Sequence, residues 1–142
     1  MTDPGSPLQA VAPPEPRLKV ALRWLLAVAM VTVGVTHFTS PGGFVSIVPP
    51  YLPAPLLLVH LSGVAEVAGG VGILVPRVRR AAGWGLIALY IAVFPANIHM
   101  AVNQVPLGDT PAPAWVLWLR LPLQAVFIAW AWWVAAARPR KH

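Results

Sequence analysis

The chain contains no cysteine and little charge, with ten Lys or Arg and four Asp or Glu among its 142 residues. The absence of cysteine excludes disulfide bonds, thiol catalysis and thiolate ligation of a metal. Charged residues make up 10% of the chain, whereas they make up about 25% of a soluble domain. Hydrophobic residues make up 58%. This composition excludes the soluble classes of protein and predicts a protein that resides in a membrane.

Nine of the ten basic residues fall in three clusters separated by long apolar runs. The connections at 39–53 and 103–113 contain no Lys or Arg. Cytoplasmic loops of membrane proteins are enriched in basic residues, so this pattern predicts that both termini and the middle loop are cytoplasmic. We expect the cations to contact anionic lipid headgroups and not nucleic acid. The clusters are Arg17, Lys19 and Arg23; Arg77, Arg79 and Arg80; and Arg138, Arg140 and Lys141.

Four apolar segments meet or approach the roughly 20 residues that cross a bilayer as a helix. They span approximately residues 20–38, 55–75, 81–102 and 114–137. We therefore expect an all-α, polytopic membrane protein, a four-transmembrane-helix bundle with both termini cytoplasmic, placed in the cell membrane and specifically an inner membrane. Its membrane domain comprises residues 17–137. A disordered, Pro-rich cytoplasmic tail at 1–16 and a basic cytoplasmic tail at 138–142 flank that domain.

Two opposite charges, Glu66 and Arg120, lie inside the expected spans. An isolated charge in a span costs at least about 2.5 kcal/mol, so we expect the two side chains to pair. The pair could be a structural device that fixes helix register or part of a functional site, and the sequence leaves both open. Gly63, Gly69 and Gly70 on the same span predict close helix packing around Glu66.

Further polar residues gather in the outer half of the expected bundle and predict a polar pocket there. Pro95 also frees a backbone carbonyl near Ile91, which an Asn or Arg side chain could satisfy. The Pro-rich connection at 41–55 is expected to lie at the membrane interface or over the mouth of the bundle. Three of the pocket residues are histidines, but they lack a ligating spacing, so no metal and no catalytic residue is assigned. The candidate residues are Glu66, Arg120, His60, Asn97, His99, His37 and Gln124.

Several motifs give the chain a resemblance to a known family, the DoxX-like small integral membrane proteins. They are His37-Phe38, the Pro-rich stretch 47–53, Ser62-Gly63-Val64-Ala65-Glu66 with Gly69-Gly70, and the stretch 94–101. The resemblance covers roughly residues 20–136. It implies a four-helix bundle and an association of some relatives with respiratory quinone-linked or sulfur-oxidising complexes. It supplies no catalytic residues, and the lack of cysteine departs from relatives proposed to work with thiol redox partners.

Two classes of function remain open, and the first is favoured. The protein would be a non-catalytic subunit or scaffold of a membrane assembly, possibly a redox assembly, with partner membrane or redox subunits. Alternatively, it would be a quinone-like small-molecule binding protein or a membrane oxidoreductase component that uses the polar pocket. A transporter is a third class, and it would require a homo-oligomer because four spans make a thin pore wall. The cofactor, if one exists, is undetermined.

Overall fold

The computed structural model describes residues 14–106 and 111–136, so most of both expected tails lies outside the described residues. All regular structure in the described part is helical. The elements are α1 (Arg17–Thr39), α2 (Gly42–Val45), α3 (Pro55–Gly72), α4 (Arg79–Asn103) and α5 (Ala114–Ala135). Four of them, α1, α3, α4 and α5, are long and apolar enough to cross a membrane. This confirms the expected all-α fold with four candidate spans.

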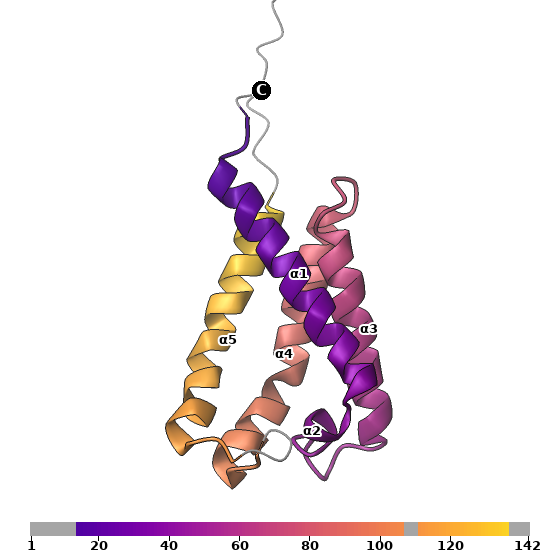
Figure 1. Ribbon diagram of the computed structural model, residues 1–142, viewed down its shortest axis with the longest axis vertical. Coiled ribbons are helices and arrows are strands. Elements are labelled where there is room, and N and C mark those ends of the chain that lie inside the picture. Colours follow the sequence, from indigo (N-terminus) through magenta and orange to yellow (C-terminus); the bar gives the residue numbers. More distant parts are fainter. Residues whose placement is uncertain (1–13, 107–110, 137–142) are drawn as a thin grey trace, which may run out of the picture.

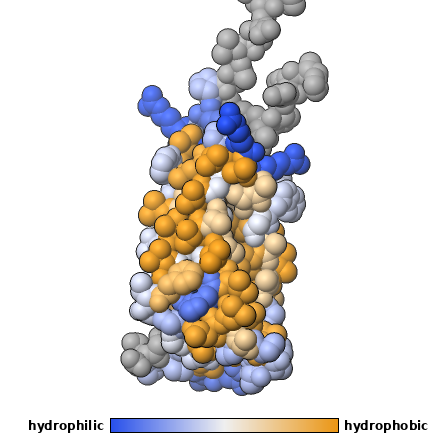
Figure 2. Space-filling model, turned by 90° about the vertical axis from the view of Figure 1, so that its right-hand side faces the viewer, coloured by the Kyte–Doolittle hydropathy of each residue, from blue (hydrophilic) through white to orange (hydrophobic). Residues whose placement is uncertain are grey.

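The surface of the bundle is apolar, as a lipid environment requires. Trp24, Leu61 and Val126 are each more than half exposed, with relative exposures of 56%, 55% and 57%. Figure 2 shows hydrophobic side chains covering the middle of one face, with hydrophilic side chains gathered at the end where α1 begins. A soluble monomer rarely exposes so large an apolar patch. The surface therefore supports the membrane assignment independently of helix length.

The long helices form two antiparallel pairs, α1 with α3 and α4 with α5, and the pairs join where α3 packs on α4 (Figure 1). At one end of the bundle α1 lies against α5, because Arg23 of α1 hydrogen-bonds the carbonyl of Val134. Toward the opposite end, α1 and α5 diverge (Figure 1). The bundle is therefore closed at one end and spread at the other.

Glycines allow α1 and α3 to approach to backbone contact. A Cβ atom added at Gly63 would lie 2.7 Å from the Cβ of His37 and 2.9 Å from the carbonyl oxygen of Gly34. A Cβ atom added at Gly34 would lie 3.0 Å from the Cβ of Glu66. Each glycine thus faces the polar residue of the other helix. Close backbone approach through small residues is the common way to join helices in lipid, where no hydrophobic force drives association.

Basic residues bind helix C-termini at the closed end, which we call the basic end. Lys19 donates to the carbonyl of Ala136 at 3.0 Å, and Arg23 donates through Nε to the carbonyl of Val134 at 3.0 Å. Arg79 donates in the same way at the end of α3. The last carbonyls of a helix lack partners within the helix and carry partial negative charge, so cations stabilise them. These three residues therefore support the fold in addition to the topological role that the sequence predicts.

Candidate functional site

A cavity of about 650 Å³ lies between the helices. It is on the side of the α1–α5 contact that faces away from the basic end. All five helices and the segment that follows α2 contribute to its lining. Most of the lining side chains are aliphatic or aromatic, among them Leu58, Val93 and Phe127. Its volume falls within the roughly 300–1,000 Å³ of typical small-molecule sites. The cavity is therefore large enough for a ligand and suited to an apolar one.

The Pro-rich segment packs over the end of this cavity that lies away from the basic end. The ring of Phe44, on α2, stacks on the ring of His37 with their centroids 3.9 Å apart. Ile47 and Pro49 are buried and line the cavity, whereas Tyr51 is 74% exposed. The prolines prevent a long helix here, and the segment instead folds back onto the bundle. It covers the cavity at the end opposite the basic end.

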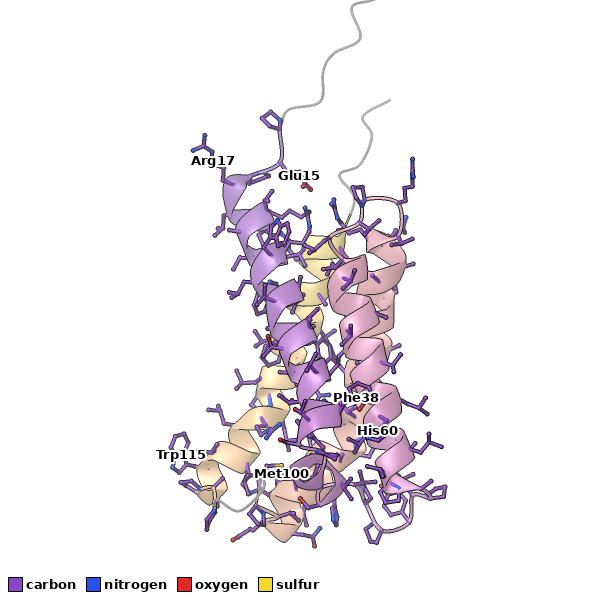
Figure 3. All side chains as sticks on the ribbon, turned by 45° about the vertical axis from the view of Figure 1, so that its right-hand side comes forward. Glu15, Arg17, Phe38, His60, Met100 and Trp115 are labelled. Atoms are coloured by element: carbon purple, nitrogen blue, oxygen red, sulfur yellow. The ribbon has the colours of Figure 1, made fainter. Side chains whose placement is uncertain are left out.

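Five of the seven predicted site residues line the cavity, and two do not. His60 lies beside Phe38, with their rings stacked at a centroid distance of 5.2 Å (Figure 3). His99 contacts Asn103 within 2.8 Å and does not line the cavity. The structure thus brings together a polar set from four helices, namely His37, Glu66, Asn97, Arg120 and Gln124.

Glu66 lies against His37 and does not form the expected ion pair with Arg120. The His37 Nδ1 atom is 2.9 Å from the carbonyl oxygen of Val33 and 3.3 Å from Glu66 Oε2. A carbonyl can only accept, so Nδ1 carries a hydrogen and directs it to Val33. Oε2 of Glu66 is consequently buried without a hydrogen bond from any described residue. Glu66 therefore contacts His37 without a hydrogen bond, and its carboxyl retains unused capacity to accept or to donate.

Arg120 projects from α5 on the other side of the cavity and is half-buried. Within residues 14–106 and 111–136, no carboxylate oxygen lies within 4.0 Å of its guanidinium, and no hydrogen bond to it is formed. A guanidinium is always charged and presents five donors in a planar fork. Its donors are therefore available to a molecule in the cavity.

Gln124 connects α5 to the proline-containing part of α4. Its Nε2 donates to the carbonyl of Tyr90, and its Oε1 accepts from Asn97 Nδ2 at 2.9 Å. Pro95 lacks an N–H, which weakens the helical hydrogen bonding one turn before it. The sequence predicted that an Asn or Arg would satisfy a carbonyl near Ile91. Instead, Gln124 reaches the neighbouring carbonyl, and Asn97 holds Gln124 in place.

The polar groups of the cavity can hydrogen-bond and exchange protons, but they form no metal site. In the part of the chain that the structure describes, no group of three or more His, Asp or Glu side chains could hold a metal ion. Arg120 can donate to an oxygen of a bound molecule. Glu66 and His37 supply a carboxyl and an imidazole, which are common proton carriers in membrane proteins.

The fold and the cavity define a small helical protein with four candidate membrane spans around an internal site. The chain belongs to the family described as Domain of unknown function (DUF8561), whose sequence model matches residues 26–135. That range includes every residue that lines the cavity. Comparison with curated proteins and with solved structures gives no match.

Proposed function

We propose that this protein binds a lipid-soluble small molecule with an oxygen-bearing polar head in the cavity. One observation carries the proposal: the apolar cavity of about 650 Å³ contains Arg120 and Glu66, both with hydrogen-bonding capacity that no described residue uses. Buried polar groups normally find partners, so polar atoms of a ligand are the natural complement. Quinones belong to this class of ligand, and the resemblance to the DoxX-like proteins is in keeping with them.

The alternative role as a scaffold loses one of its supports. Glu66 and Arg120 do not pair, so they do not fix helix register together. The glycines of α3 pack within the chain, since Gly63 faces α1 and a Cβ atom at Gly72 would lie 2.8 Å from the Cβ of Ala82 on α4. They are therefore not free to receive a partner's helix. These contacts favour ligand binding, and an oxidoreductase complex remains one setting in which a bound quinone would act.

The binding proposal is tested by filling the cavity. Ala92 and Ala88, one turn earlier on α4, are both exposed, but of the two only Ala92 lines the cavity. The wild type and the Ala88→Phe variant should carry the same small molecule in native mass spectrometry and lipid extracts, and Ala92→Phe should lose it. Circular dichroism should show equal helix content in all three. An identical set of bound molecules in the three proteins would mean that the cavity is not the site.

We also propose that the protein resides in the cell membrane, an inner membrane, with both termini cytoplasmic. The basic end carries Lys19, Arg23 and Arg79, and the opposite connections carry no Lys or Arg, which is the asymmetry of the positive-inside rule. The absence of cysteine makes single-cysteine labelling direct. An impermeant maleimide applied to spheroplasts should label Gln104→Cys at once and Arg77→Cys only after permeabilisation. The reverse order would invert the proposed orientation.

A further inference from the structure

We infer that the ligand is an anionic amphiphile whose carboxylate or phosphate head binds Arg120 and whose apolar chain reaches the cavity from the bilayer, between α1 and α5. This inference rests on the proposed binding function and narrows the class of ligand. Three features of the described residues point to such a ligand: the charge on each side of the cavity, the apolar lining, and the side on which the bundle is spread.

The charge distribution within the cavity selects an anion. Arg120 is permanently positive and has no carboxylate of a described residue within 4.0 Å. Glu66 lies across the cavity on α3, with its Oε2 turned to His37 at 3.3 Å. Gln124 and Asn97, beside Arg120, are engaged with each other and with the Tyr90 carbonyl. The guanidinium is therefore the unused group on its side, and oxyanions match its planar fork with two parallel hydrogen bonds.

The rest of the lining accommodates a hydrocarbon chain. Leu58, Val59, Leu89, Val93 and Phe127 face the cavity. Transfer of an apolar chain into such surroundings from water is favourable, and from lipid it is close to neutral. The polar head is therefore the part of the ligand whose contacts make binding in the cavity more favourable than remaining in the bilayer. Specificity for charge is expected to dominate specificity for the chain.

Helix contacts close three of the four sides of the cavity, and the contact between α1 and α5 on the fourth side is sparse. Backbone contact at Gly34 and Gly63 closes the α1–α3 side, and packing joins α3 to α4 and α4 to α5. Phe44 and Ile47 cover the end that lies away from the basic end. Between α1 and α5 the hydrogen bonds lie at the basic end, and the two helices diverge beyond it (Figure 1). We therefore place the entry of a molecule dissolved in the bilayer between α1 and α5, where neighbouring long helices contact each other least.

The test compares three probes that share one chain: oleate, oleyl phosphate and the uncharged oleyl alcohol. Binding is measured by titration calorimetry with the protein in nanodiscs of neutral lipid. A hydrogen-bonded charge pair in a sheltered site should favour the anions by roughly 10- to 100-fold over the alcohol. Arg120→Gln should abolish that preference, Arg120→Lys should retain part of it, and Arg77→Gln, which changes an exposed arginine, should leave it intact. The tighter of the two anions identifies the head.

The two proposals fail in distinguishable ways. Equal binding of all three probes to the wild type, or an anion preference that persists in Arg120→Gln, would overturn the anionic class. If the alcohol then still loses binding in Ala92→Phe, the cavity binds a neutral molecule and the proposed function stands. If Ala92→Phe binds every probe as the wild type does, the proposed function fails as well.

Discussion

The Gly63→Ala substitution probes the contact that places His37 and Glu66 in the site. Gly63 faces α1 so closely that the added methyl carbon would lie 2.7 Å from the Cβ of His37 and 2.9 Å from the Gly34 carbonyl oxygen. Carbon atoms in contact prefer separations of about 3.5–4.0 Å, so α1 must move by about 1 Å. A third obstructing atom is Cε2 of the Phe38 ring, at 2.9 Å. The first two atoms cannot rotate away, because one is a Cβ and the other belongs to the backbone.

The magnitude follows from two opposing terms. Overpacking a close contact costs about 1–3 kcal/mol, whereas alanine favours a helix over glycine by about 1 kcal/mol. Gly85→Ala on α4 isolates the second term, because an added Cβ there meets nothing within 4 Å. We therefore expect Gly63→Ala to be less stable than Gly85→Ala by about 1–3 kcal/mol. Because both variants gain the intrinsic preference of alanine for the helix, this preference cancels when their stabilities are compared.

Unfolding by a denaturing detergent, followed by circular dichroism, measures this difference for the purified protein. The same variant should weaken retention of the cavity ligand, because displacement of α1 moves His37 away from Glu66. Equal stability of Gly63→Ala and Gly85→Ala would refute the α1–α3 contact and with it the geometry of the site.

Two further predictions concern the basic end. Arg23→Gln leaves the buried Val134 carbonyl unpaired and should lower the free energy of unfolding by about 1–3 kcal/mol. Arg17→Gln removes the same charge from an exposed position and should change the free energy of unfolding by less than about 0.5 kcal/mol. Equal shifts of the melting temperature in the two variants would contradict the role of Arg23. The hydrogen bonds from Arg23 lower the pKa of Glu15 below its ordinary value of 4.5. Because the folded pKa is the lower one, this pair should contribute fully above pH 4.5 and lose its contribution as the pH falls through the folded pKa. The contribution should stay below about 1 kcal/mol, since the Glu15 side chain is 30% exposed. In Glu15→Gln, the melting temperature should fall less steeply with decreasing pH below pH 4.5 than in the wild type. An unchanged fall would contradict the contribution of the Arg23–Glu15 pair.

The four long helices were predictable because hydrophobic length and charge clusters are local properties of the sequence. The expected bounds differ from the observed ones by at most three residues. The largest difference is at α3, which ends at Gly72 and not at Val75. Three glycines near its end weaken the helix, and Pro76 biases the preceding residue away from helical geometry. This signal was present in the sequence.

The prediction that Glu66 pairs with Arg120 was wrong, because the cost of an isolated charge in a span does not identify the polar residue that lies closest to it. His37 lies in the last turn of α1, and the chain continues through α2, where the ring of Phe44 stacks on that of His37. A better signal was available in the spacing of Gly34 to His37 and of Gly63 to Glu66, which is three residues in both helices. In an antiparallel pair, matched spacing places each glycine opposite the other helix's polar residue.

The capping contacts at the basic end could not be read from the sequence. Arg23 and its acceptor Val134 are separated by 111 residues, and the acceptor is a backbone carbonyl that no side-chain pattern marks. The stacking of Phe44 on His37 was equally hidden, since it depends on how the Pro-rich segment folds back. Local sequence patterns predict which residues are polar and at what level they lie, but the helix crossing decides which of them meet.

An experimental structure of the protein in lipid nanodiscs tests the central claim most directly, because it shows whether a molecule occupies the cavity. We predict that α1 and α5 stand apart beyond the basic end, with a bound amphiphile between them whose head contacts Arg120. A structure in which α1 packs along α5 and side chains fill the space around Arg120 and Glu66 would contradict the account.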